Sequence, residues 1–143
     1  MLRAFFVLTM LIASSASAQS QKISPEDALA LAQSEKITIV DIRSPAEWAA
    51  SGMPAPAVGA SLLDDARKPR AAFLDEILAL VDGDRSRPIA LICASGNRSA
   101  FAEKLLAERG FTALYDISEG MTGGKNGPGW LARALPTSPC QAC

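Results

Sequence analysis

The sequence contains no histidine, and this absence excludes several kinds of catalytic and metal-binding site. Histidine is the general base of Ser-His-Asp and Cys-His catalysis and a common ligand of protein-bound zinc. A cysteine nucleophile in this chain must therefore be activated by backbone dipoles or by arginine. We expect no metal ion and no other cofactor.

Excess charge is also missing, and cysteine is scarce. The chain has 14 basic and 15 acidic residues, with no basic block of the kind that binds nucleic acid or a membrane surface. Its three cysteines are Cys93, Cys140 and Cys143. An odd count in an oxidising compartment leaves at least one thiol free or paired between chains. The simplest division pairs Cys140 with Cys143, as a disulfide or a redox pair, and leaves Cys93 alone.

The first 18 residues have the pattern of a secretory signal peptide. Arg3 precedes the apolar run Ala4–Ala13, and Ala16 and Ala18 form an A-x-A cleavage pattern. The run is too short for a membrane anchor, which needs about 20 apolar residues. We therefore expect cleavage after Ala18 and a periplasmic or secreted mature protein that the membrane does not hold.

In the rest of the chain, short apolar runs alternate with helical patterns. The runs 37–42, 88–93 and 112–117 predict buried strands, and a shorter strand is expected near 58–60. Helices are predicted at 24–34, 44–51, 69–81, 98–109 and 128–135. This alternation predicts an α/β fold, with a small, mostly parallel sheet flanked by helices on both faces. We assign one domain to residues 19–136 and a C-terminal tail to 137–143.

Two details of the predicted helices bear on packing. In the helix 98–109, an apolar stripe at Phe101, Leu105 and Leu106 is expected to face the core. In the helix that starts after Ser44, Glu47 completes a capping box with that serine. Glu47 also stands four residues after Arg43, the spacing of an ion pair.

The segment from Cys93 to Ser99 carries the strongest chemical signal. An apolar run ends at Cys93, a short loop containing Gly96 follows, and a helical pattern begins near Arg98. Unpaired N–H groups at a helix N-terminus favour an anion, and a thiolate is an anion. We therefore predict that Cys93 is the nucleophile. The predicted loop that binds its anion consists of Ala94, Ser95, Gly96, Asn97, Arg98 and Ser99.

This segment, CASGNRS, resembles the active-site loop of single-domain rhodaneses, a family of sulfurtransferases. Further segments resemble that family in the same order, namely DIRSPAEW at 41–48, the stretch 54–62 and the EGM…W…LP ending at 119–136. The resemblance implies a rhodanese-like fold over residues 24–136. It also implies transfer of a sulfane sulfur from a donor such as thiosulfate, through a Cys93 persulfide, to a small thiophilic acceptor or a partner protein's thiol.

The resemblance also implies roles for individual residues. Arg98 would bind the anionic donor, while Asp41 and Arg43 would brace the loop. Trp48 and Trp130 are expected in the core or the pocket wall. The spacing from Cys93 to Arg98 is one residue shorter than the C-x5-R loop of related phosphatases and arsenate reductases, which favours sulfur transfer over oxyanion chemistry. A sulfur carrier or partner-docking module without free turnover remains the alternative.

Two segments depart from the family pattern. Met53 stands where the family often has a structural histidine. The glycine-rich stretch 122–129 is longer than usual and forms either a flap near the site or an inert surface loop. The sequence makes no prediction of the oligomeric state.

Overall fold

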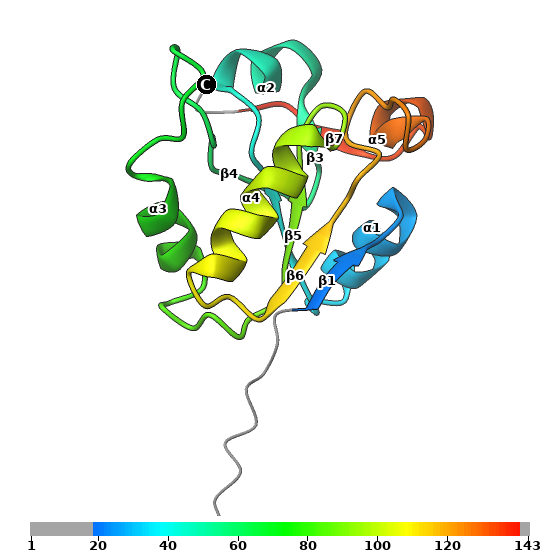
Figure 1. The fold of residues 1–143 in the computed structure, drawn as a ribbon. Coiled ribbons are helices and arrows are strands. Elements are labelled where there is room, and N and C mark those ends of the chain that lie inside the picture. The colour runs from blue at the N-terminus through cyan, green and yellow to red at the C-terminus, as the bar shows by residue number, and fades with distance from the viewer. Residues whose placement is uncertain (1–18, 141–143) are drawn as a thin grey trace, which may run out of the picture.

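Five parallel strands form the main sheet of the computed structural model, which describes residues 19–140 (Figure 1). In chain order they are β1 (Gln19–Lys22), β2 (Thr38–Asp41), β4 (Val58–Gly59), β5 (Ile89–Ile92) and β6 (Ala113–Asp116). Their order across the sheet is β1-β6-β5-β2-β4, so β5 is central. Because all the strands are parallel, their carboxyl ends lie at one edge, where Asp41 ends β2 and Cys93 follows β5.

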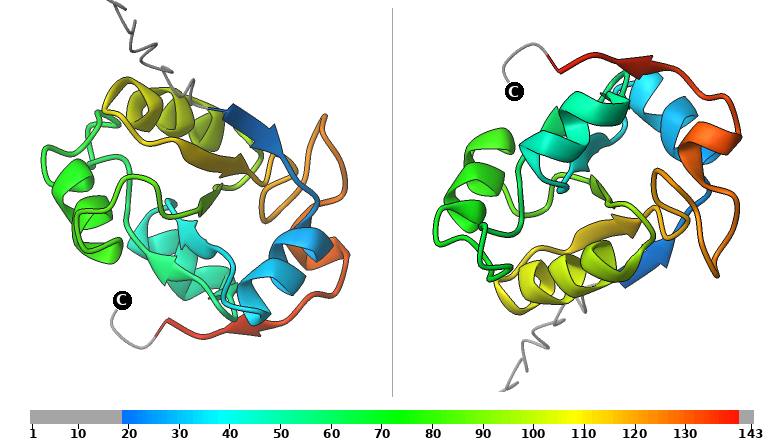
Figure 2. Two further views of the ribbon diagram at one scale, coloured as in Figure 1. Left: turned by 90° about the horizontal axis from the view of Figure 1, so that it is seen from below. Right: turned by 90° about the horizontal axis from the view of Figure 1, so that it is seen from above.

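Helices cover both faces of this sheet (Figure 2). Phe73 and Ile77 of α3 (Phe73–Leu80) share one hydrophobic cluster with Ala102 and Leu106 of α4 (Asn97–Glu108). On the opposite face, a second cluster contains residues of α1 (Pro25–Gln33) and α5 (Gly129–Ala132). The short helix α2 (Pro45–Ser51) lies beyond the carboxyl edge of β2 (Figure 1). The predicted α/β architecture is therefore confirmed.

The central strand, β5, is an unbroken apolar run because both of its faces are covered. All four side chains of β5 are buried, with Ile89 and Leu91 in the first cluster and Ala90 and Ile92 in the second. A strand covered on both faces has no solvent side, so polar residues need not alternate with apolar ones. The position of Cys93, directly after this strand, is fixed by the most deeply buried part of the sheet.

Three short strands were not predicted. β1 is polar in sequence, and it gains its strand conformation by pairing with β6 at the edge of the sheet. β3 (Met53–Pro54) and β7 (Thr137–Ser138) form a separate antiparallel pair, and β7 lies just beyond the predicted domain end at residue 136. Each of these strands is defined by backbone pairing with distant residues, which a local hydrophobic pattern does not report.

The predicted apolar stripe of α4 was wrong at one position. Phe101 is 50% exposed, whereas the buried positions of the helix are Ser99, Ala102, Glu103 and Leu106. Their spacing defines a helical face that includes the polar side chains of Ser99 and Glu103. The spacing of apolar residues alone therefore misplaced part of the buried face.

Some expectations from the sequence fall outside the described residues. The predicted signal peptide, 1–18, and Cys143 both lie there. Cys140 takes part in a disulfide, whereas Cys93 is a free thiol. Between residues 19 and 140, no helix is long and apolar enough to cross a bilayer.

A pair of substitutions in α4 tests this orientation of the helix. Leu106→Ala should lower the free energy of unfolding by about 2–5 kcal/mol, because it opens a cavity in the core. Phe101→Ala should cost less than about 1 kcal/mol, because half of that side chain already contacts water. Urea denaturation measures both values, and equal losses would contradict the orientation.

Candidate active site

Cys93 lies at the junction between β5 and α4. It follows the last residue of β5, and α4 begins four residues later at Asn97. Cys93 is only 1% exposed, and its thiol is not part of a disulfide. The thiol therefore lies at the carboxyl edge of a parallel sheet and at the N-terminus of a 12-residue helix, where backbone N–H groups favour an anion.

Two backbone amides of the loop donate hydrogen bonds to the sulfur. The N–H of Gly96 lies 3.1 Å from Cys93 Sγ, and the N–H of Ser99 lies 3.4 Å from it. The hydroxyl oxygen of Ser99 lies 3.6 Å from the same sulfur. Gly96 has a φ of 92°, and a Cβ at that position would collide with the carbonyl oxygen of Ser118. A glycine is therefore required for the turn that aims these amides at Sγ.

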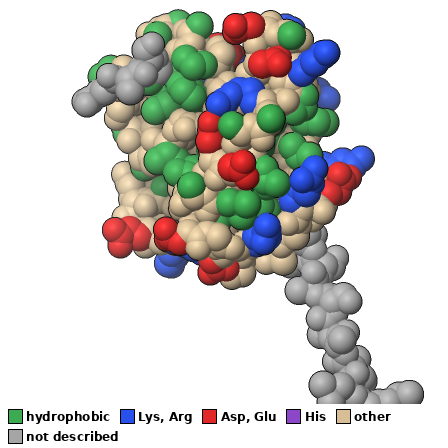
Figure 3. Space-filling view, turned by 90° about the vertical axis from the view of Figure 1, so that its left-hand side faces the viewer, with side chains coloured by type: hydrophobic (Ala, Val, Ile, Leu, Met, Phe, Trp, Pro, Cys, Tyr) green, Lys and Arg blue, Asp and Glu red, His purple; other side chains and the backbone are tan. Residues whose placement is uncertain are grey.

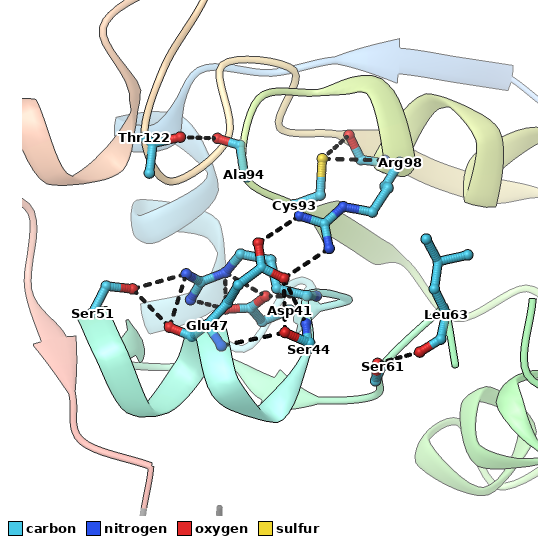
Figure 4. A network of polar contacts seen from close by, with 12 residues as sticks. Asp41, Ser44, Glu47, Ser51, Ser61, Leu63, Cys93, Ala94, Arg98 and Thr122 are labelled. Atoms are coloured by element: carbon cyan, nitrogen blue, oxygen red, sulfur yellow. Dashed lines mark hydrogen bonds and ion pairs between the residues drawn. The ribbon is translucent and has the colours of Figure 1, made fainter. Parts of the chain in front are cut away.

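Residues 120–122, where the glycine-rich stretch begins, hold the cysteine loop from behind. The Met121 N–H donates to the Cys93 carbonyl at 2.8 Å. The backbone N–H and the hydroxyl of Thr122 both donate to the Ala94 carbonyl, at 2.9 and 3.0 Å (Figure 4). A Cβ at Gly120 would overlap the Ala94 carbonyl, so this approach also requires glycine. The segment 120–122 thus supports the loop, and residues 123–129 continue from it.

Arg98 makes a bidentate ion pair with Glu47 of α2 at the rim of the site (Figure 4). Its two terminal nitrogens lie 2.6 and 2.8 Å from the two carboxylate oxygens. The hydrogen bond from Arg98 is the main reason that the pKa of Glu47 falls to about 2, against the partial burial that raises it. The same interaction raises the pKa of Arg98. Glu47 is therefore a carboxylate at neutral pH.

This pairing differs from the Arg43–Glu47 ion pair that the spacing in the sequence offered as one alternative for Arg43. Arg43 instead contacts only the backbone carbonyl of Glu47, at 3.4 Å. Its guanidinium bonds the carboxylate of Asp41, with the shortest contact at 2.7 Å, and also bonds Ser51 and Gly52. Asp41 and Arg43 are 0% and 2% exposed, so they form a buried bridge between the end of β2 and α2. They position α2, which presents Glu47.

A cavity of about 390 Å³ opens beside the cysteine. It brings together four of the predicted site residues, Cys93, Ser95, Asn97 and Arg98. The remaining wall comes from residues that sequence reasoning did not place here, namely Ser44, Glu47, Ser61, Leu63, Asp64 and Arg67. Four of these belong to the segment after β4. Its position after a strand was the one signal that could have found them, because loops at that end of parallel strands face the site.

The two tryptophans lie in different surroundings. Trp130 is fully buried in the second hydrophobic cluster, and its indole N–H donates to the Pro136 carbonyl at 3.0 Å. The ring of Trp48 lies against Gly59, where a Cβ would approach it to 2.9 Å. Trp48 also lines a second cavity beside α2. Neither tryptophan lines the cavity that contains Cys93.

A buried carboxyl lies behind the loop, at the end of β6. Asp116 is 1% exposed, and one of its oxygens has no hydrogen-bond partner among the described residues. Burial raises the pKa of Asp116, while its interaction with the Ser99 side chain opposes that shift. Nothing in the local sequence distinguishes this aspartate from others at the end of a strand.

The family model of the rhodanese-like domain matches residues 24–126 of the chain. Thiosulfate sulfurtransferase GlpE of Pseudomonas putida is 32% identical over 100 residues, which cover 70% of this chain and 80% of that protein. The crystal structure of Rv0390 from M. tuberculosis has a TM-score of 0.68 at 29% identity, covering 87% of this chain and 100% of that chain. The polysulfide-sulfur transferase homodimer of Wolinella succinogenes has a TM-score of 0.62 at 30% identity, covering 89% and 84%.

The ion pair at the rim gives the protein a defined pH dependence. Because the pKa of Glu47 is lowered from 4.5 to about 2, its contribution to stability is complete above pH 4.5 and is lost as the pH falls towards 2. Glu47→Gln should therefore lower the free energy of unfolding at pH 7 by about 1–2 kcal/mol, a value reduced for partial solvent exposure. Chemical denaturation at several pH values should show this loss shrinking below pH 4.5.

A double-mutant cycle supplies the control for that measurement. Arg98→Gln should cost less in the Glu47→Gln background than in the native protein, because the two side chains interact directly. If the loss of unfolding free energy caused by Glu47→Gln stayed constant as the pH was lowered, the stabilising role of the Arg98–Glu47 ion pair would be contradicted.

Proposed function

The chain belongs to the rhodanese-like domain family, and on this basis we propose that it is a sulfurtransferase that uses Cys93. The observation that carries this proposal is the pair of amides, from Gly96 and Ser99, that point at Cys93 Sγ. Such amides stabilise a negatively charged sulfur, whether as the thiolate or as the outer sulfur of a persulfide. The chain has no histidine to take the thiol proton, so the amides are the main source of activation.

The reaction has two steps. In the first, the Cys93 thiolate attacks the outer sulfur of thiosulfate, a new S–S bond forms, and the old one breaks as sulfite leaves with its electron pair. In the second, a nucleophile such as cyanide attacks the outer sulfur of the persulfide, and the Cys93 thiolate leaves. Charge is conserved in each step, and no oxidant or reductant is needed. This is covalent, ping-pong catalysis.

The length of the loop supports sulfur transfer over phosphate or arsenate chemistry. Four residues separate Cys93 from Arg98, and both terminal nitrogens of Arg98 are engaged by the carboxylate of Glu47. An enzyme for a tetrahedral oxyanion needs more donors around a larger group. The compact turn at Gly96 suits a single added sulfur atom.

A role as a sulfur carrier is the second candidate, and one observation favours it. A cleft of about 280 Å³ adjoins the cavity, and its lining includes Leu62, Leu63, Pro69 and the half-exposed Phe101. Apolar side chains beside a reactive group suit the docking of a partner protein that donates or accepts sulfur. A carrier would form the Cys93 persulfide but would transfer it slowly to small acceptors.

We assign the mature protein to the periplasm or the extracellular space. This assignment rests on the signal-peptide pattern of residues 1–18 and agrees with the disulfide at Cys140, since disulfides persist mainly in oxidising compartments.

Assays with thiosulfate and cyanide test the proposed activity. The native protein should produce thiocyanate, and Cys93→Ser should abolish it because the persulfide has no attachment site. Cys140→Ser is the matched control, and it should retain activity because Cys140 does not line the cavity. Turnover that survived Cys93→Ser would refute the mechanism, while a persulfide formed without turnover would favour the carrier.

The role of the turn can be tested separately. Gly96→Ala should lower kcat/KM by about tenfold or more, because the new methyl group displaces the amides that face the sulfur. Gly83→Ala is the control, since Gly83 also has a positive φ, of 77°, but a Cβ at that position would meet no atom within 4 Å. Equal effects of the two substitutions would show that backbone strain, rather than the position of the amides, sets the activity.

A further inference from the structure

Four charged side chains line the cavity beside Cys93, and only part of their charge is balanced. Arg98 and Glu47 neutralise each other through contacts of 2.6 and 2.8 Å. The other two are Asp64 and Arg67, from the segment between β4 and α3. Because Arg98 is already paired, its guanidinium is not a free cation for an incoming anion. The side chain that could take this role is Arg67.

The turn that carries Arg67 is closed by hydrogen bonds of its own. The Asp64 N–H donates to the Lys68 carbonyl at 2.8 Å, and the Arg67 N–H donates to the Asp64 carbonyl at 2.9 Å. An oxygen of the Asp64 carboxylate accepts the Lys68 N–H at 2.8 Å. An isolated bridge between Leu63 and Pro69 closes the base of the turn. The turn is thus a built feature of the cavity wall.

Arg67 itself adopts an uncommon backbone conformation. Its φ is 60°, in the left-handed region that residues other than glycine rarely occupy. Such conformations persist where the surrounding hydrogen bonds over-determine them, and they cluster at ligand-binding sites. The side chain lines both the cavity of Cys93 and the adjoining apolar cleft. Within residues 19–140, no ion pair or hydrogen bond engages the Arg67 guanidinium.

The reaction proposed above needs a cation at this place. A thiolate that attacks thiosulfate brings a monoanion to a dianion, and the carboxylate of Asp64 adds further negative charge to the wall. The surrounding surface supplies no large positive field, because basic, acidic and apolar side chains are interspersed on the face that carries α3 (Figure 3). Attraction of the donor therefore depends on a local positive charge.

We propose that Arg67 binds the anionic end of a small sulfane-sulfur donor, such as the sulfonate group of thiosulfate, while the Gly96 and Ser99 amides hold the Cys93 sulfur. This inference rests on the proposed sulfurtransferase function and specifies its donor class. Arg67 contacts the donor's oxygen atoms before reaction and the departing sulfite afterwards. Arg98 then serves to hold Glu47 and α2 in place rather than to bind the donor.

Arg67→Gln tests this assignment, because it removes the charge and keeps a long polar side chain. The expected result is a loss of about tenfold in kcat/KM for thiosulfate, mainly through a higher KM, since one charged hydrogen-bonding contact is lost. Transfer of sulfur from the preloaded persulfide to dithiothreitol, a neutral acceptor, should not change. Added salt should lower kcat/KM less in Arg67→Gln than in the native protein.

Lys68→Gln is the matched control for charge. Lys68 is the next residue of the same turn and is exposed, but it does not line the cavity. Its substitution should change kcat/KM by less than about twofold, because an exposed charge outside the cavity is screened. Arg67→Lys should recover part of the loss. Equal KM values for Arg67→Gln and Lys68→Gln would overturn the proposal.

A binding measurement separates this proposal from the proposed activity. Calorimetric titration of thiosulfate into Cys93→Ser, with and without Arg67→Gln, reports donor binding in the absence of sulfur transfer. We expect about tenfold weaker binding when Arg67 is replaced. If the native protein transferred no sulfur, the proposed activity would fail, yet this comparison would still decide the role of Arg67. The proposed role of Arg67 would be overturned if Cys93→Ser bound no thiosulfate, or if Cys93→Ser bound thiosulfate equally well with and without Arg67→Gln.

Discussion

The whole site depends on the two hydrogen bonds from the amides of Gly96 and Ser99 to the sulfur of Cys93, at 3.1 and 3.4 Å. In a chain without histidine, these amides and the N-terminus of α4 supply the positive potential that an anionic sulfur requires. Two sets of close contacts hold the loop so that these amides point at the sulfur. The Ser118 carbonyl leaves room only for glycine at position 96, and residues 120–122 fix the cysteine loop from behind.

Two ion pairs, Asp41–Arg43 and Glu47–Arg98, neutralise two carboxylates near the sulfur, so these carboxylates do not oppose the amides. The buried Asp41–Arg43 bridge ties the end of β2 to α2, and α2 in turn presents Glu47 to Arg98. Each pair keeps a carboxylate neutralised near a site that must accept negative charge. Breaking one partner of a buried pair would leave the other uncompensated, which explains why both partners are held by several hydrogen bonds.

Much of this arrangement could be predicted from the sequence, and the failures have physical causes. The strands β2, β5 and β6 are apolar because both faces of the sheet are covered, so their positions were predictable. The Cys93 loop was predictable because a strand, a glycine turn and a helix follow one another. The partner of Glu47 could not be predicted, because Arg98 lies 51 residues away in the sequence. The spacing of four residues pointed to Arg43 instead. Arg67 was also missed, because its only signal was its position in a segment after a strand, and tertiary structure places the turn that carries it beside the cavity.

The central claim is that this loop holds a negatively charged sulfur on Cys93, and mass spectrometry tests it most directly. The intact protein is incubated with thiosulfate, freed of excess reagent and digested without reductant. The account predicts one additional sulfur atom on the peptide that contains Cys93 and its removal by cyanide. An unmodified Cys93 peptide after exposure to thiosulfate and to polysulfide would contradict it.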